Sequence, residues 1–241
     1  GGSIAFQVFS HFLGPVPDVE CVKEMPSLVK VIHRLLKEKK IIAYHDRSDG
    51  GLICCLIEMA FAGRSGLDIT LDKICESDDE ILEALFNEEL GMVIQVPSDN
   101  IEEVISLISE IGFSEDVYRI AFPNKTKKIK LFKDKSLILE RELEDLLKEW
   151  NFVSFKMQSL RDNPETAHRE YLFEIDTKRQ GLSPKVSYEI PKKINYLSSK
   201  PSIAILREQG VNGQVEMAAA FDRVGFSCVD VHMTDLIENR R

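Results

Sequence analysis

Short apolar runs alternate with amphipathic stretches over most of the first 160 residues, which is the pattern of a mixed α/β domain. The apolar runs predict strands over 41–44, 67–71, 92–96, 117–122 and 129–132. Helical spacing of apolar residues predicts helices over 3–13, 26–40, 51–62, 78–90, 98–111 and 137–160. We therefore expect a fold with at least four strands packed on helices.

The pattern changes after Asn163-Pro164, where residues 164–200 become polar and rich in Pro, Lys and Ser. We predict a linker with little regular structure there. Beyond it, a strand over 203–206, a helix over 215–224 and a strand over 228–231 predict the opening β-α-β unit of a parallel sheet. About forty residues cannot cover both faces of such a sheet. The chain also opens on Gly1 without a Met, so we expect it to be a piece of a longer polypeptide.

Composition narrows the function classes. The 241 residues are 44% hydrophobic, so a sizeable core is possible, and the net charge of −9 argues against a nucleic-acid surface. The sequence has neither a membrane-spanning apolar run nor a signal peptide. Five cysteines without metal spacing suit a reducing, cytoplasmic location. Cys54 and Cys55 lie in an apolar helical run, where we expect them to be core thiols.

The richest chemistry lies in residues 43–52, Ala-Tyr-His-Asp-Arg-Ser-Asp-Gly-Gly-Leu, at a predicted strand-to-helix turn. Carboxylates such as that of Asp46 can hold Mg²⁺ through oxygen. Gly50 and Gly51 let the backbone approach a ligand, and amides at the helix start can face phosphate. The alternative is a turn without a ligand, in which Asp49 caps the helix. Chemistry alone leaves both interpretations open.

Several longer motifs occur in a fixed order along the chain. They are His45-Asp46-Arg47-Ser48-Asp49-Gly50-Gly51-Leu52, Glu58-Met59-Ala60-Phe61-Ala62-Gly63, Leu85-Phe86-Asn87-Glu88-Glu89-Leu90-Gly91, Arg161-Asp162-Asn163-Pro164, Leu206-Arg207-Glu208-Gln209-Gly210-Val211-Asn212-Gly213, Glu216-Met217-Ala218-Ala219-Ala220-Phe221 and Asp230-Val231-His232-Met233. Together they make the whole chain resemble the large, single-chain phosphoribosylformylglycinamidine synthases (formylglycinamide ribonucleotide amidotransferases) of bacterial purine biosynthesis.

The resemblance implies a layout in three parts, with an α/β (α+β) fold class. Residues 1–150 would be the C-terminal lobe of the second synthetase-like half, of the aminoimidazole-ribonucleotide-synthetase type. Residues 151–200 would be a helix end and linker. Residues 201–241 would begin a class I glutamine amidotransferase domain, which the chain leaves incomplete. These parts would pack against N-terminal synthetase and C-terminal glutaminase parts outside the chain.

The resemblance also assigns two residues at the turn. Asp46 would coordinate Mg²⁺, and Ser48 would contact ATP or ADP at a second, structural site of the synthetase half. The other magnesium ligands would come from a preceding lobe. We assign no ligand role to His45, which we expect to be a hydrogen-bonded neighbour, or to Arg47, which we expect to pair with a local carboxylate. Glu88 and Glu89 resemble metal ligands, but we expect a solvated or salt-bridged helix end.

The family converts formylglycinamide ribonucleotide to formylglycinamidine ribonucleotide with ATP and with ammonia from glutamine, without a nucleic-acid or membrane partner. The resemblance places the amidotransferase nucleophile and its partners beyond residue 241, so it gives this chain no catalytic residue. Cys228 and His232 do not match that nucleophile or its histidine. The isolated chain is therefore expected to be inactive.

Two alternatives remain open from the sequence. One is another enzyme of the same superfamily, such as a selenophosphate synthetase or a thiamine-phosphate kinase, which shares the Asp-Gly-Gly turn but lacks the amidotransferase opening after residue 201. The other is a non-catalytic remnant that only binds nucleotide or docks on a partner.

Overall fold

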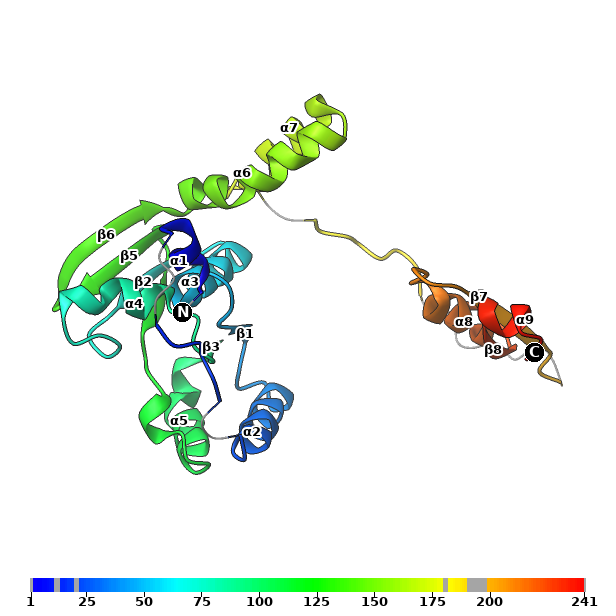
Figure 1. Cartoon of the computed structure of the whole chain (residues 1–241), viewed down its shortest axis with the longest axis horizontal. Coiled ribbons are helices and arrows are strands. Elements are labelled where there is room, and N and C mark those ends of the chain that lie inside the picture. Colours follow the sequence, from blue (N-terminus) through cyan, green and yellow to red (C-terminus); the bar gives the residue numbers. More distant parts are fainter. Residues whose placement is uncertain (1, 11–13, 20–21, 180–181, 190–198, 241) are drawn as a thin grey trace. The chain divides into compact units, whose positions relative to one another are not determined.

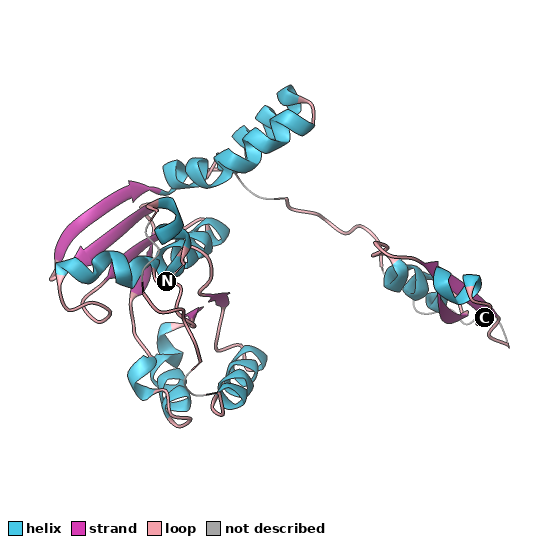
Figure 2. Ribbon diagram, viewed as in Figure 1, coloured by secondary structure: helices cyan, strands magenta, loops and turns pink. Residues whose placement is uncertain are grey.

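A computed structural model describes residues 2–10, 14–19, 22–179, 182–189 and 199–240 (Figure 1). Helices and strands alternate along the chain, so the expectation of a mixed α/β fold is confirmed (Figure 2). The helices are α1 (Ile4–Val8), α2 (Met25–Lys37), α3 (Gly51–Gly63), α4 (Ile81–Phe86), α5 (Ile101–Ser109), α6 (Leu143–Arg161), α7 (Pro164–Ile175), α8 (Gln214–Arg223) and α9 (Met233–Ile237). The strands are β1 (Ala43–Asp46), β2 (Gly66–Thr70), β3 (Met92–Gln95), β4 (Ala121–Asn124), β5 (Lys128–Lys133), β6 (Ser136–Glu142), β7 (Ser202–Arg207) and β8 (Ser227–His232). They form two compact units, Gly1–Arg179 and Gln180–Arg241.

Four strands of the first unit form one sheet in the order β4-β2-β5-β6. β2 is parallel to β5 and antiparallel to β4, and β6 is antiparallel to β5. Alternate side chains of the two central strands point inward, among them Ile69, Ile129 and Leu131. Helix α3 packs its apolar side chains, such as Leu56, into the same core. The prediction of at least four strands packed on helices is therefore confirmed.

A second, smaller core lies around the antiparallel pair β1 and β3. Helix α2 contributes Ile32 and Leu35, whose three-residue separation places them on one helix face. Helix α5 contributes Val104 and Ile108, one turn apart. Met92 and Ile94 of β3 pack on this core, and Met92 pairs with Asp46, so the core supports the strand end that carries Asp46.

The expected helix over 137–160 is wrong at its start. Residues 136–142 form strand β6, and α6 begins only at Leu143. Pairing with β5 places the ammonium of Lys128 beside the carboxylates of Glu140 and Glu142, at 2.6 and 3.2 Å. These cross-strand contacts and the backbone ladder outweigh a helical preference that rests on local spacing alone.

The expectation of little regular structure over 164–200 is also wrong in its first part, because residues 164–175 form α7. The Asn163 side chain accepts hydrogen bonds from the backbone N–H groups of Glu165 and Thr166, at 3.0 and 3.1 Å. Pro164 occupies the first helical turn, where its missing N–H costs nothing. The same Asn-Pro pair that suggested a linker is thus a helix start signal. Residues 190–198 of the expected linker lie outside the described residues.

Several other helices and strands begin or end a few residues away from the predicted positions. The expected helix over 78–90 is a 3₁₀ turn, Asp78–Glu80, followed by the short α4, which ends at Phe86 with extended backbone at Asn87. The expected strand over 117–122 begins only at Ala121, and β1 lies two residues later than expected. The expected helix over 3–13 ends at Val8, and its last residues, 11–13, lie outside the described residues.

The second unit contains the expected β-α-β arrangement. β7 and β8 pair in parallel, with Ser202 opposite Ser227, and α8 connects them. The Asp230 carboxylate of β8 accepts from Arg207 Nε of β7 at 2.8 Å. Helix α9 follows β8 and was not predicted. Among the described residues of both units, no helix combines the length and apolar composition needed to cross a bilayer.

Limited proteolysis should cut the 241-residue chain first between α7 and β7. Residues 182–189 have no regular structure, and Leu182 and Tyr188 are 91% and 72% exposed, so a protease can bind this backbone without unfolding a helix. Brief chymotrypsin digestion followed by mass spectrometry of the first fragments is the measurement. First cuts confined to residues 50–110 would contradict this prediction.

Candidate functional site

The turn between β1 and α3 holds the two residues assigned from the sequence. Along β1, side chains alternate in direction, so Tyr44 and Asp46 share one face and His45 lies on the other. Asp46, the last residue of the strand, and Ser48, in the turn, are both exposed. The structure therefore places Asp46 and Ser48 together at one solvent-facing turn.

Asp46 is held by three hydrogen bonds. The phenol of Tyr44 donates to its carboxylate Oδ1 at 2.5 Å. Its carbonyl oxygen accepts from His45 Nδ1 at 2.7 Å and from the Ser48 hydroxyl at 3.2 Å. Burial, reinforced by the bond to Asp46, raises the pKa of Tyr44 to about 12, so the phenol remains a donor at neutral pH. These bonds therefore hold both the side chain and the carbonyl of Asp46 in one orientation.

Two glycines give the turn its shape. Gly50 and Gly51 have φ of +83° and +72°, the left-handed region that glycine enters without strain. A Cβ on Gly51 would lie 2.6 Å from the backbone carbon of Phe86, so this close approach to α4 requires the missing side chain. The first turn of α3 can therefore sit directly against the end of α4.

The alternative in which Asp49 caps helix α3 is wrong. The residue at the start of α3 is Gly50, and no side chain of the turn caps the helix. The Glu88 carboxylate caps it from a distance, accepting from the N–H of Gly50 at 2.8 Å and also from that of Ile4 at 2.9 Å. The expectation that Glu88 belongs to a solvated or salt-bridged helix end is wrong for the same reason: it binds backbone amides of two other segments.

Arg47 also differs from expectation. Its guanidinium Nε donates to the backbone carbonyl of Glu89 at 2.6 Å, rather than to a carboxylate. Its backbone N–H donates to the Gly91 carbonyl at 2.9 Å. Burial lowers the pKa of Arg47, and the nearby charge of Glu89 opposes that shift. Arg47 thus ties the turn to the segment before β3.

His45 is a hydrogen-bonded neighbour of the site. Its Nε2 lies 2.9 Å from Oε2 of Glu58, on α3, and Oε1 of Glu58 accepts from the indole Nε1 of Trp150, on α6, at 3.0 Å. Glu58 and Trp150 were not assigned from the sequence. The sequence did contain one indication. Glu58 lies two helical turns after Gly51, so both residues are on the same face of α3.

Three of the described cysteines, Cys54, Cys55 and Cys75, are poor nucleophiles. Cys55 is 2% exposed, and burial raises the pKa of its thiol to about 11. Burial also raises the pKa of Cys54 and Cys75. The thiol of Cys228 donates to the Ala218 carbonyl at 3.3 Å, and His232 Nδ1 accepts from the Thr234 N–H at the start of α9. Cys21 lies outside the described residues.

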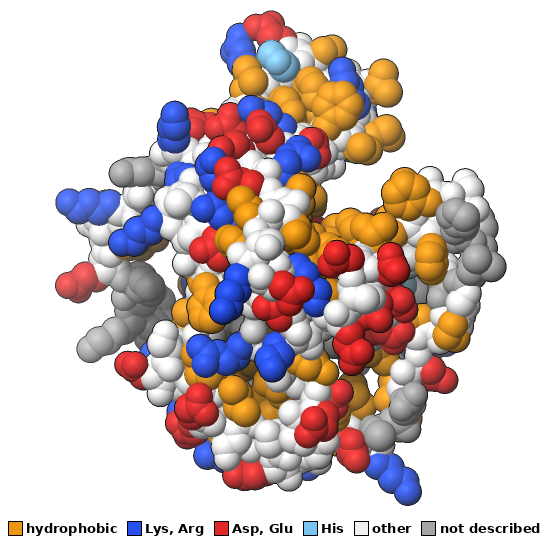
Figure 3. Space-filling model, turned by 90° about the vertical axis from the view of Figure 1, so that its left-hand side faces the viewer, with side chains coloured by type: hydrophobic (Ala, Val, Ile, Leu, Met, Phe, Trp, Pro, Cys, Tyr) orange, Lys and Arg blue, Asp and Glu red, His pale blue; other side chains and the backbone are white. Residues whose placement is uncertain are grey.

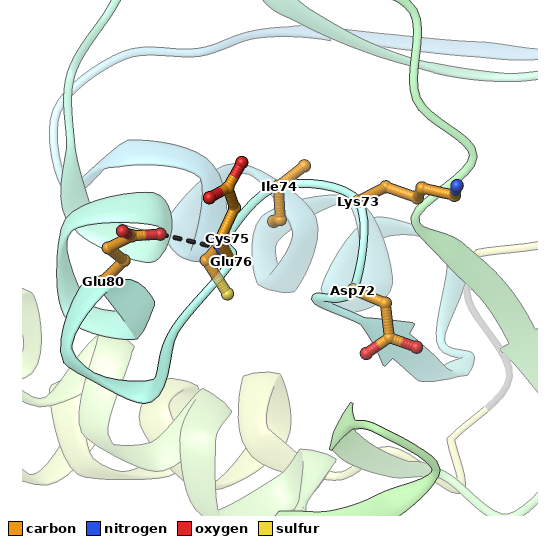
Figure 4. Close-up of a pocket in the computed structure, with 6 residues that line it drawn as sticks. All are labelled: Asp72, Lys73, Ile74, Cys75, Glu76 and Glu80. Atoms are coloured by element: carbon orange, nitrogen blue, oxygen red, sulfur yellow. Dashed lines mark hydrogen bonds between the residues drawn. The ribbon is translucent and has the colours of Figure 1, made fainter.

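A separate cavity of about 400 Å³ lies beside residues 72–80 (Figure 4). Its carboxylates resemble a cation site, but two of the three, those of Asp72 and Glu80, bind backbone amides. Asp72 accepts from the Asp134 N–H at 2.8 Å, and Glu80 accepts from the Glu76 N–H at 2.8 Å. The ammonium of Lys133 donates to the carbonyl of Cys75 at 2.8 Å. This cavity therefore offers no free ligand set.

No group of three or more His, Cys, Asp or Glu side chains in the described part of the chain could enclose a metal ion. Asp46 has the chemistry of a single ligand in a magnesium site whose other ligands come from elsewhere. One carboxylate oxygen is engaged by Tyr44, the residue is exposed, and Mg²⁺ commonly takes one or two carboxylates together with phosphate oxygens and water.

Comparison with known proteins decides the family. Residues 3–134, more than half of the chain, match the profile described as AIR synthase related protein, C-terminal domain. The chain belongs to this family. Residues 200–241 match the CobB/CobQ-like glutamine amidotransferase domain. These two matches, in this order, confirm the resemblance that the motifs indicated.

Solved structures give weaker likenesses. Thermotoga maritima PurL complexed with FGAR is 20% identical with a TM-score of 0.41, over 50% of this chain and 20% of PurL. PurLQS from Thermotoga maritima is 14% identical with a TM-score of 0.45, over 93% of this chain and 31% of that chain. The HypE–HypF complex is 19% identical with a TM-score of 0.41, over 58% and 46%. The chain thus spans a fifth to a third of the length of the PurL chains.

Gly51→Ala should destabilise the chain by about 1–3 kcal/mol, because the new Cβ meets the Phe86 backbone and φ is positive. Gly63→Ala, at the open end of the same helix, is the matched control and should stabilise by about 0.5–1 kcal/mol. Urea unfolding measures both. An unchanged midpoint for Gly51→Ala would contradict the close approach of α3 to α4.

Proposed function

We propose that this chain is part of an ATP- and glutamine-dependent carbon–nitrogen ligase that converts formylglycinamide ribonucleotide to formylglycinamidine ribonucleotide in purine biosynthesis. The observation that carries the proposal is the order of domains: a synthetase-type C-terminal lobe over 3–134, followed by the opening of an amidotransferase domain over 200–241. An enzyme that takes nitrogen from glutamine and energy from ATP needs both. The parts that would complete each domain lie outside this chain. We also propose that the enzyme is cytoplasmic.

The proposed role of the β1–α3 turn is to hold a nucleotide through magnesium. Asp46 would be one Mg²⁺ ligand, and the Ser48 hydroxyl would contact the nucleotide. Mg²⁺, when bound, would neutralise phosphate charge. The supporting geometry is the orientation of Asp46 by Tyr44 and His45 and the exposure of both assigned residues. Structures of Thermotoga maritima PurL contain ATP and ADP, so a protein that this chain resembles binds the proposed nucleotides.

The rest of the turn supports this role through its own residues. Glu88 engages the Gly50 amide and Arg47 engages the Glu89 carbonyl, so both ends of the turn are fixed to the segment between α4 and β3. A rigid turn keeps the Asp46 oxygens in one place, which reduces the entropy that ligand binding must remove. We propose that the site is structural, as the resemblance implies.

Asp46→Asn in the full-length polypeptide should reduce retained nucleotide by about tenfold, with a smaller loss of turnover per folded molecule. Asn keeps an oxygen for the Tyr44 phenol and removes the charge that Mg²⁺ needs. Asp49→Asn, an exposed neighbour in the same turn, is the matched control. The measurements are nucleotide content of the purified proteins and specific activity. Full retention would refute the metal role, and abolished turnover in an intact fold would show a catalytic site.

The isolated 241-residue chain should release no glutamate from glutamine and form no amidine. Thiolate attack requires an accessible thiol with an ordinary or lowered pKa, and burial raises the pKa of Cys54, Cys55 and Cys75. A coupled glutamate assay on the chain and on a Cys228→Ser variant is the measurement. Glutamate release that disappears in Cys228→Ser would contradict this prediction and identify Cys228 as a nucleophile.

A further inference from the structure

Three hydrogen bonds join the Asp46 turn to helix α6. His45 Nδ1 bonds to the Asp46 carbonyl at 2.7 Å, His45 Nε2 lies 2.9 Å from Glu58, and the Trp150 indole donates to Glu58 at 3.0 Å. The residues come from β1, α3 and α6, which are separated by up to about a hundred positions in the sequence. Glu58 stands between the other two and uses one carboxylate oxygen for each.

The direction of each bond follows from the chemistry of the groups. A backbone carbonyl only accepts, so Nδ1 of His45 must donate to Asp46, and an indole N–H only donates, so Glu58 must accept from Trp150. A carboxylate also only accepts, so the contact between His45 Nε2 and Glu58 is a hydrogen bond when the ring carries protons on both nitrogens. The Trp150 ring also packs edge-on against Phe61, with centroids 5.9 Å apart. Because Phe61 lies three residues after Glu58 on α3, both contacts of Trp150 come from one helix face.

Helix α6 in turn packs against α7. Phe155 of α6 stacks on Tyr171 of α7 with ring centroids 4.6 Å apart, and Gln158 donates to Glu170 at 2.7 Å. The hairpin formed by α6 and α7 exposes large apolar side chains, including Trp150 itself at 57% and Leu160 at 85%. Apolar side chains gather on the upper part of the face shown in Figure 3. Trp150 is therefore the residue of this hairpin that bonds to Glu58.

We propose that Glu58 is a positioning residue for the Asp46 turn. Through His45 it holds the Asp46 carbonyl, and through Trp150 it ties that carbonyl to the α6–α7 hairpin, so that the two move together. This inference rests on the proposed nucleotide role of the turn. Glu58 would not bind the cation. It would act by restricting the backbone of Asp46, the residue whose carboxylate would bind the cation.

The first test needs no nucleotide. Trp150 is the only tryptophan of the chain, so its indole N–H gives one NMR signal in the 241-residue protein. Glu58→Ala should shift that signal, since the acceptor is lost, and His45→Ala should also shift it, since the carboxylate loses its other partner. Glu58→Gln should restore a signal close to wild type, because its amide oxygen can accept from Trp150 while its amide N–H donates to Nε2 of the neutral His45 ring.

The matched control is Glu170→Ala, which removes a carboxylate that is bonded to α6 but takes no part in the His45–Glu58–Trp150 hydrogen bonds. Its indole signal should stay at the wild-type position. Thermal unfolding of each variant checks that the fold is retained. An indole signal that ignores both Glu58→Ala and His45→Ala would overturn the proposal.

The second test measures nucleotide affinity in the full-length polypeptide. Glu58→Ala should weaken MgADP binding by about tenfold, the usual size of an effect transmitted through a ligand's supporting residues, and Glu58→Gln and Glu170→Ala should bind as wild type does. Equal weakening in Glu58→Ala and Glu170→Ala would overturn the positioning role. A wild-type protein that binds no MgADP would overturn the proposed function instead, while the NMR result still decides whether Glu58 couples the turn to α6.

Discussion

Helix α3 can begin where it does only because Gly51, with no side chain, lets its first turn lie against the backbone at the end of α4. The rest of the first unit depends on this approach. It brings the apolar face of α3, with side chains such as Leu52 and Leu56, onto the β4-β2-β5-β6 sheet, where each buried leucine contributes about 2 kcal/mol. It also aims the preceding turn, with Asp46, toward solvent at the end of β1.

Carboxylates around this turn serve the protein backbone and its neighbours more than they serve a ligand. Glu88 accepts from two amides of distant segments, and Glu58 accepts from an indole while facing His45. A buried or half-buried carboxylate with two such partners is satisfied and has little to offer a cation. Asp46 differs because its carboxylate accepts one hydrogen bond, from the neighbouring Tyr44, and because the residue is exposed.

Local patterns predicted most elements where apolar residues formed a strong periodicity, as in α2, α3 and β5. They failed where a distant segment or a cap decided the outcome. Strand β6 exists because β5 offers it a ladder and Lys128 pairs with its glutamates. Helix α7 exists because the Asn163 side chain satisfies the first amides of a segment whose composition resembles a linker.

The sequence by itself determined the mixed α/β class, the order of the two domains and the turn that holds Asp46 and Ser48, because these depend on local periodicity and on contiguous motifs. Only the tertiary structure decided which carboxylate caps α3, what Arg47 binds, and that Glu58 links His45 to Trp150. Those partners lie far apart along the chain, and hydrogen bonds between them form only after the core brings α3, α4 and α6 together. A pattern of neighbouring residues cannot show which distant residues will become partners.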